Sequence, residues 1–531
     1  MKQLLSVLII AMLFMLSCKK ADQVTPVTSN NNLATSAATT QIATAQIAKT
    51  NLSITFNAAS MVNVKDYGAK GDNYTDDTKA IRSALAYAKA NGKTAVYFPD
   101  GSYIVADAGN TSGVIELKNG VGLLGSSPAT CHIKLSQGRY NPPSIFYQAW
   151  WNEPTVSNLV IQGIDFDGTS FGQTFSADYQ YCHALSINNG QNIEVSNCKF
   201  ESFRGDGLLF GDTFLSSVNL RMTSNVSVHD SEFLNIYREG TMFCCTDNGS
   251  FYNNNVHGTG YLVGGVDIER HSVNETVTNI SVYNNIFNFS DGYGPVERGG
   301  PIVKYRRAVT MGFFYNGHTG GTADSRSGGH KIYNNTVYQG QIDCWGHTNV
   351  SITGNTFTNS YENIAGVNMV SAPAINVADP ANTSGLVNIV VSNNTINSAM
   401  GNGIAFNHYQ NITANSNIIN GSPLDGISIY NSTGLFDSNN IQNAGLSTQK
   451  ASGIVINGNT NGTLVVSHNT VTDTRSGSNR TVNFGVAIQS QNNGSVAPRI
   501  EYNNSKNLVG GVVSLYYYQQ AFASLLANTG S

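Results

Sequence analysis

The nine residues Asn192–Phe200 read NIEVSNCKF, and this phrase decides the fold of the chain. An asparagine is followed by alternating apolar and polar residues, and then by a second asparagine and another short alternation. Related phrases return as NVSVHDSEF (225–233), NISVYNNIF (279–287), NVSITGNTF (349–357), NIVVSNNTI (388–396) and NITANSNII (411–419). Alternation with a period of two is typical of β-strands that bury one face.

A second phrase lies between copies of the first, and it begins with glycine. Its copies are GLLF (207–210), GVDI (265–268), GIAF (403–406), GISI (426–429), GIVI (453–456) and GVAI (485–488). Two or three short strands per repeat, with Asn and Gly at corners that need left-handed backbone angles, indicate a coil of a parallel β-helix. The repeat length varies, and the corner asparagines can form amide ladders from coil to coil. The 3.6-residue period of helical repeats is absent.

The N-terminus reads MKQLLSVLIIAMLFMLSCKK, which is typical of an export signal. Its apolar run is short for a transmembrane helix, and Cys18 after a small residue resembles a bacterial lipobox. We expect a lipoprotein signal peptide over residues 1–18, lipidation of Cys18, and a flexible tether over 19–51 that is rich in Thr, Ala, Ser and Asn. The alternative is an ordinary secretory signal in which Cys18 is incidental. The expected location is the outer membrane or cell surface of a bacterium.

Composition limits the function classes. The 531 residues carry a net charge of −4, so the chain lacks the basic character of a nucleic-acid-binding protein. Hydrophobic residues make up 40% of the chain, which excludes a disordered protein. Six further cysteines contain no CxxC pair, so a zinc site is not indicated, whereas disulfides and buried thiols both stay open.

From Val62 to Val105 the chain reads VNVKDYGAKGDNYTDDTKAIRSALAYAKANGKTAVYFPDGSYIV. This stretch resembles the opening of pectate-lyase-like (pectin lyase-like) right-handed β-helix proteins with a rhamnogalacturonase/epimerase-like N-terminal motif. The resemblance implies an all-β solenoid with an N-terminal capping helix, in which Thr75 or Asp76 caps a helix that runs to about Ala90. We therefore expect the cap and first coils over 52–110 and the β-helix over 111–531, with its largest insertion at about 288–329.

The resemblance predicts the fold more narrowly than the substrate. The family includes polygalacturonases, rhamnogalacturonases, lyases, alginate epimerases and phage tailspikes, and one fold hosts many chemistries. The Asn-Thr-Asp, Gly-His-Gly and Arg-Ile-Lys motifs of polygalacturonases are missing, and so is the Asp-Pro-His stretch of alginate epimerases. Neither pectin nor alginate is therefore indicated as the substrate.

Charged residues gather in VDIERH (266–271), where Asp267, Glu269 and His271 share one parity and so one strand face. The stretch IDCWGH (342–347) repeats the pattern with Asp343, Trp345 and His347. One strand, AVTMGFF from Ala308, lies between them. Two coil steps place Asp267 and Asp343 roughly 9–10 Å apart at the backbone.

More charges stand at the entries of earlier strands, at Asp206 in FRGDG and at Arg238 and Glu239 in YREG. Further along the chain the matching outward positions are occupied by Ala405, Ser428, Val455 and Ala487. A merely solvated face would spread its charges over all coils. The clustering indicates a functional site in the first half of the solenoid.

Paired carboxylates are the groups that glycoside hydrolysis needs. The favoured hypothesis is a polysaccharide-degrading glycoside hydrolase with Asp267 and Asp343 as catalytic carboxylates and Glu269 as a third candidate. No cofactor is required, and a calcium ion that bridges to an acidic sugar is compatible with the acidic cluster. Substrate binding is assigned to a wider set, namely His271, His347, Trp345, Arg238, Glu239, Asp206, Lys304, Arg306 and Arg307.

Two alternatives stay open. A polysaccharide lyase that acts on a uronic acid needs a base and a cation, and ERGGPIVKYRR (297–307) offers Lys304, Arg306 and Arg307 beside the groove. A non-catalytic carbohydrate-binding solenoid would explain the missing family motifs. Sugar binding in general is favoured by Trp150 and Trp151, because flat aromatic rings stack on sugar faces.

Overall fold

The computed structural model describes most of the chain after residue 55, within one compact unit, Gln46–Ser531. The described ranges are 56–106, 113–148, 155–176, 179–211, 222–258, 264–270, 275–290, 306–312, 324–358, 372–379, 386–445, 451–458, 462–489, 497–515, 525 and 527–530. Cys18, the tether and most of the expected 288–329 insertion therefore lie outside the described residues. No helix among those described is long and apolar enough to cross a membrane.

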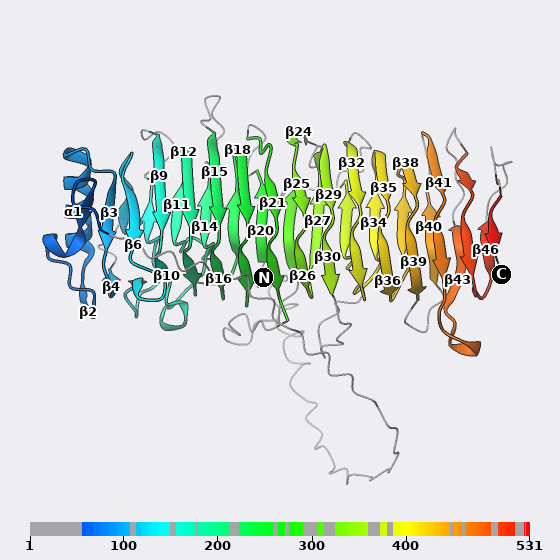
Figure 1. Cartoon of the computed structure of the whole chain (residues 1–531), viewed down its shortest axis with the longest axis horizontal. Helices are drawn as coiled ribbons and strands as arrows, with labels where there is room; N and C mark the ends of the chain where they lie inside the picture. The colour runs from blue at the N-terminus through cyan, green and yellow to red at the C-terminus, as the bar shows by residue number, and fades with distance from the viewer. Residues whose placement is uncertain are drawn as a thin grey trace, which may run out of the picture. The chain divides into compact units, whose positions relative to one another are not determined.

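The chain winds as a stack of coils, and each coil adds one strand to each of three long parallel sheets (Figure 1). Within the described ranges, sheet A has 15 strands from β1 (Met61–Asn63) to β44 (Arg499–Glu501). Sheet B has 16 strands from β2 (Asp72–Asp76) to β47 (Thr529–Gly530). This architecture confirms the predicted right-handed parallel β-helix.

Sheet C carries the glycine-started phrases and has 14 described strands. In spatial order these are β5 (Ile115–Glu116), β8 (Phe146–Tyr147), β11 (Leu185–Ile187), β14 (Leu208–Phe210), β17 (Glu239–Phe243), β20 (Gly264–Glu269), β23 (Arg307–Gly312), β27 (Gln341–Trp345), β31 (Ile375–Ala378), β34 (Ile404–Asn407), β37 (Ile427–Tyr430), β40 (Ala451–Asn457), β43 (Val482–Ile488) and β46 (Gly511–Leu515).

The corner asparagines behave as the repeats predict. Asn192, Asn225 and Asn388 all have positive φ, between 54° and 63°. Their exposed side chains form an outer ladder, in which the Asn225 amide donates to Asn192 Oδ1 at 3.0 Å. Asn tolerates this backbone region because its short polar side chain can hydrogen-bond locally.

A second, buried ladder runs inside the turn between sheets A and B. From Asn285 onward, one asparagine Nδ2 in each described coil donates to the Oδ1 of the next coil at 2.9–3.0 Å. The same Nδ2 also donates to a backbone carbonyl of the preceding coil. The members are Asn285, Asn335, Asn355, Asn394, Asn417, Asn439, Asn469, Asn503 and Asn528. This ladder satisfies polar groups that the turn would otherwise bury unpaired.

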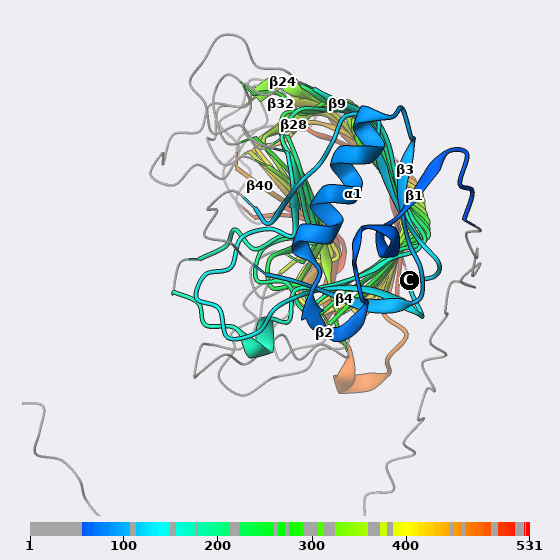
Figure 2. The same cartoon turned by 90° about the vertical axis from the view of Figure 1, so that its left-hand side faces the viewer.

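The helix expected from the N-terminal motif is α1 (Thr78–Ala90), which lies across the N-terminal end of the stack (Figure 2). It contacts β1, β3 (Ala95–Phe98) and β5 and buries Ile81 and Leu85. The carboxylate of Asp76 accepts the Thr78 N–H at 3.0 Å, while Asp77 occupies the N-cap position. The N-cap residue is therefore Asp77, one residue after the expected Asp76, whose side chain nevertheless accepts the Thr78 N–H.

The six cysteines of the described ranges are all buried, and none forms a disulfide: Cys131, Cys182, Cys198, Cys244, Cys245 and Cys344. Burial raises the pKa of the Cys182, Cys198 and Cys344 thiols to about 12. Thiols of this kind are inert core residues and not reactive centres.

Candidate functional site

Polar side chains form a first column along the outward face of sheet C. Asp267 of β20 is the register partner of Thr310 of β23, which pairs with Asp343 of β27. The two carboxylates therefore lie two coils apart, in the register that the sequence predicts. The column continues through Asn376 and then carries only small or apolar uncharged side chains, at Ala405, Ser428, Val455 and Ala487.

A second column lies at the beginning of the same strands. Glu239 is the register partner of Gly264, which pairs with Arg307, and Arg307 pairs with Gln341. Asp206 adjoins this column, because the Glu239 N–H donates to Asp206 Oδ1 at 3.3 Å.

The position of Arg307 corrects one expectation. The sequence suggested that Arg307 belongs to an insertion beside the groove, whereas it is the first residue of β23 and is buried. Its Nε lies 2.6 Å from Asp343 Oδ2, which also accepts a hydrogen bond from Gln341 at 2.7 Å. The guanidinium carbon stands 4.7 Å from the ring centroid of Trp345. A cation is thus built into the acidic columns.

Arg238 is a second cation in this cluster. Its Nε lies 3.1 Å from Glu239 Oε2 and 3.4 Å from Asp206 Oδ1. On the other side, His183 Nδ1 lies 3.2 Å from Asp206 Oδ2. His183 was missed by the sequence reasoning, because it stands before β11 in no repeated phrase.

The acids are buried and electrostatically coupled. Asp206, Glu239 and Asp343 are fully buried, and only 1% of Asp267 is exposed. Burial, and next the charge of Glu239, raises the pKa of Asp267 to about 6. Burial, and next the charge of Asp267, raises the pKa of Glu269 well above its usual range.

The Asp267 and Glu269 carboxyls also share a side-chain hydrogen bond. Two neighbouring carboxyls with raised and unequal pKa values form an acid–base pair near neutral pH. Burial and mutual repulsion thus raise the pKa of both carboxyls, so the pair holds a proton more tightly than two exposed acids would.

The remaining predicted residues divide into three groups. Trp345 lies beside Arg307, and Arg306 is partly exposed, with its Nη1 donating to Gln339 at 2.9 Å. His347 is as buried as Asp267, and its Nδ1 lies 3.0 Å from Nε2 of His330, so its expected substrate contact stays a prediction. His271, Lys304, Trp150 and Trp151 lie outside the described residues.

The acidic columns do not fit a calcium ion. Within the described ranges, no three His, Cys, Asp or Glu side chains come together to hold a metal ion. Glu239 and Asp343 instead lie against guanidinium groups.

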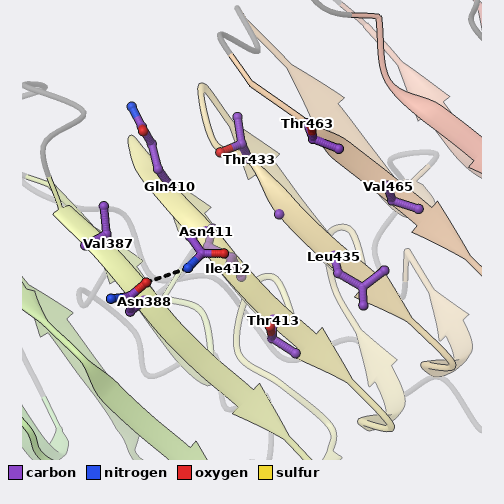
Figure 3. A pocket seen from close by; sticks show the side chains of 11 residues that line it. Val387, Asn388, Gln410, Asn411, Ile412, Thr413, Thr433, Leu435, Thr463 and Val465 are labelled. Carbon is purple, nitrogen blue, oxygen red and sulfur yellow. Dashed lines mark hydrogen bonds between the residues drawn. The ribbon is translucent and has the colours of Figure 1, made fainter.

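A hollow of about 520 Å³ lies away from this cluster, on sheet A. It spans β32 (Leu386–Ser392), β35 (Tyr409–Asn415), β38 (Gly434–Asp437) and β41 (Leu464–Ser467) (Figure 3). Amides such as Gln410 and Asn411 and apolar side chains such as Leu435 line it, and none of its lining residues is ionisable. Acid–base chemistry therefore points to sheet C and not to this hollow.

Comparison with known sequences agrees with the resemblance noted above. Residues 61–295 match the model of the family described as rhamnogalacturonase A/epimerase, pectate lyase-like. Mannuronan C5-epimerase AlgE3 of Azotobacter vinelandii is 28% identical over 203 residues, which is 38% of this chain and 11% of that protein. Alginate lyase 7 of the same organism is 30% identical over 210 residues, 39% of this chain and 24% of that protein. The matches thus span a quarter or less of these relatives.

Comparison with solved structures supports the fold. The tailspike protein of E. coli bacteriophage HK620 aligns with a TM-score of 0.53 at 15% identity, over 89% of this chain and 80% of that chain. The sequence relatives carry the names of polysaccharide epimerases and lyases. The preference for a glycoside hydrolase is therefore not supported.

Proposed function

We propose that this chain modifies a uronic-acid-containing polysaccharide by removing the proton at C5 of a uronic acid, the step that lyases and C5-epimerases share. The observation that carries this proposal is the buried guanidinium of Arg307 within the carboxylate columns. Removal of the C5 proton moves negative charge onto the adjoining sugar carboxylate, and a fixed cation stabilises that charge. The names of the sequence relatives support the same chemistry.

The geometry suggests a role for each group. Asp267, with its pKa of about 6, is ionised at neutral pH and accepts the C5 proton. Glu269 keeps its proton and donates it. In a lyase the Glu269 proton goes to the departing glycosidic oxygen as the C4–O bond breaks. In an epimerase the C4–O bond stays intact, and water on the side opposite Asp267 returns a proton to the other face of C5. Arg307, oriented by Asp343 and Trp345, neutralises the sugar carboxylate.

Hydrolysis fits this geometry less well. Inverting hydrolases hold their carboxyls about 6.5–9.5 Å apart and retaining ones about 5–5.5 Å apart. The Asp267 and Glu269 carboxyls are in direct hydrogen-bond contact. Asp343 is occupied by Arg307 and Gln341. Asp343, which lies two coils from Asp267, is thus held by a cation and an amide instead of facing an attacking water.

Product analysis tests the proposal. Wild-type protein and the Asp267→Asn variant are incubated with alginate, polygalacturonate and a neutral polysaccharide in D2O, and products are followed by mass spectrometry and NMR. Unsaturated ends indicate a lyase, and deuterium at C5 of intact chains indicates an epimerase; both signals should be lost in the variant. Fragments that have gained water, without deuterium at C5, would refute proton abstraction.

We also propose that the chain is exported and held at a membrane through lipidated Cys18, as its N-terminal sequence suggests. A Cys18→Ala variant should leave the membrane fraction for the soluble fraction. Continued membrane association of this variant would contradict the anchor.

A further inference from the structure

The corner between sheets B and C carries three exposed aromatic side chains. Tyr140 is 67%, Phe171 66% and Tyr181 55% exposed. They belong to two successive loops, one from β7 (Cys131–Leu135) to β8 and one from β10 (Asp165–Asp167) to β11. These cyan-to-teal loops project beyond the solenoid in the view down its axis (Figure 2). Large aromatic residues are mostly buried, so a group of exposed ones marks a contact surface.

The two loops form one fixed platform. The Ser176 N–H donates to Asn141 Oδ1 at 2.8 Å, and the Tyr179 hydroxyl donates to the carbonyl of Pro142 at 2.8 Å. Tyr140 also forms a parallel bridge with Thr174 of the second loop. The backbones of the two loops are therefore held relative to one another before any ligand binds, which reduces the entropy lost on binding.

Partly buried rings support the platform from below. Phe175 and Tyr179 lie with ring centroids 6.1 Å apart, and Tyr179 meets Tyr181 edge-on at 5.8 Å. The Arg204 guanidinium lies 5.3 Å from the centroid of Phe175 and 3.6 Å from that of Tyr237. This packing anchors Tyr181 while its own ring stays exposed.

The platform adjoins the carboxylate cluster. The Gly205 N–H donates to the carbonyl of Cys182 at 2.8 Å, and the Asp206 N–H donates to His183 Nδ1 at 2.8 Å. Tyr181 is thus two residues from the histidine that contacts the Asp206 carboxylate. The strand that follows Tyr181, β11, is three coils from β20, which carries Asp267. About 14 Å therefore separate β11 from β20 along the axis of the solenoid.

We infer that Tyr140, Phe171 and Tyr181 form an aromatic shelf that binds sugar rings of the polysaccharide on the N-terminal side of the reacting unit. The apolar C–H face of a sugar ring stacks on an aromatic face, while its hydroxyls stay hydrated or meet the amides of these loops. Because the shelf lies three coils from Asp267, only a chain of several sugars can reach both. The shelf therefore adds affinity for long chains and not for short fragments. The kind of polysaccharide that binds rests on the proposed function. The sugar-binding role of the shelf does not depend on which reaction the protein catalyses.

The test compares the triple variant Tyr140→Ala/Phe171→Ala/Tyr181→Ala with Tyr74→Ala, which removes a 91% exposed tyrosine at the N-terminal end. Binding is measured by affinity electrophoresis in gels that contain alginate, polygalacturonate or a neutral glucan, in an Asp267→Asn background. We expect at least a tenfold loss of affinity in the triple variant and none in the control. All three side chains are exposed, so the melting temperature should change little.

Kinetics separate this inference from the proposed function. With an active enzyme, the triple variant should raise KM for polymer at least tenfold at unchanged kcat, and leave a trisaccharide unaffected. If no polymer is turned over, but retardation is lost in the triple variant, the shelf stands and the proposed reaction fails. Three outcomes would overturn the shelf. The triple variant and the control could be retarded equally, or no polymer could retard the wild type. The triple variant could also change its oligomeric state.

Discussion

Replacing Asn394 by alanine removes one member of the buried asparagine ladder. Asn394 is fully buried, and its Oδ1 accepts two hydrogen bonds from Asn355, one from the backbone N–H and one from Nδ2, both at 3.0 Å. Its own Nδ2 donates to the Ile352 carbonyl at 2.9 Å and to Asn417 Oδ1 at 3.0 Å. Asn394→Ala therefore breaks these four hydrogen bonds together.

The expected loss follows from these contacts. Each buried hydrogen bond contributes about 1 kcal/mol net, which gives about 4 kcal/mol for the four bonds. The Asn355 N–H and the Ile352 carbonyl are left unpaired in the interior, so the loss extends to about 6 kcal/mol. Asn394 does not have a positive φ, so alanine adds no backbone strain.

The matched control is Asn411→Gly in the exposed outer ladder. Asn411 has φ 53°, which glycine accepts, and its amide donates to Asn388 at the surface. We expect a loss below about 1 kcal/mol there. Urea unfolding gives the difference in free energy, and hydrogen exchange should rise most in the coils next to Asn394, because coils contact only their neighbours. A loss for Asn394→Ala within about 1 kcal/mol of the control would refute the role of the ladder.

Four further predictions concern the site and the thiols. Arg307→Lys should lower kcat/KM about tenfold or more, because lysine lacks the planar group that meets Asp343 and Trp345, whereas Arg306→Lys should stay within about twofold. The value of kcat/KM should rise with pH with a midpoint near 6 as Asp267 ionises, and a pH-independent rate would contradict its role as base. The folded protein holds the Glu269 proton more tightly than the unfolded chain does. The free energy of unfolding therefore falls as pH rises above the usual carboxyl pKa. Glu269→Gln removes this loss, so it should raise the melting temperature at about pH 8 and not at about pH 4. Six of the seven cysteines should react with a thiol reagent only after unfolding, and rapid labelling of the native protein would show that the core is open.

The coil architecture could be predicted because its constraints repeat. Corners with left-handed residues recur from coil to coil, and many strands of sheets A and B bury alternate side chains, so the phrases recur at matching positions. This regularity also placed Asp267 and Asp343 in one column.

The contacts of single side chains could not be predicted in this way. Arg307 stands one residue before the strand that the sequence suggested, which began at Ala308. It ends a segment that contains no repeated phrase. Its place in the column of Glu239 and Gln341 was therefore missed. His183 and the aromatic shelf lie on loops, where no period relates one coil to the next. The sequence places His347 on the outward face only because it shares parity with Asp343. Its contact with His330 could not be predicted, because His330 belongs to a different segment of the chain.

The buried asparagine ladder has a direction. Every side-chain carbonyl in it points toward the N-terminal coil and every amide nitrogen toward the C-terminal coil, because each Nδ2 donates forward to the next Oδ1. Aligned amide dipoles in a low-dielectric interior polarise one another and add up along the axis. The solenoid therefore carries an electrical polarity of its own, independent of its net charge, with the negative end toward α1. If an asparagine in the middle of the ladder were replaced by aspartate, a carboxylate oxygen would take the place of its Nδ2. That oxygen would face the side-chain Oδ1 of the next coil, which needs an N–H donor.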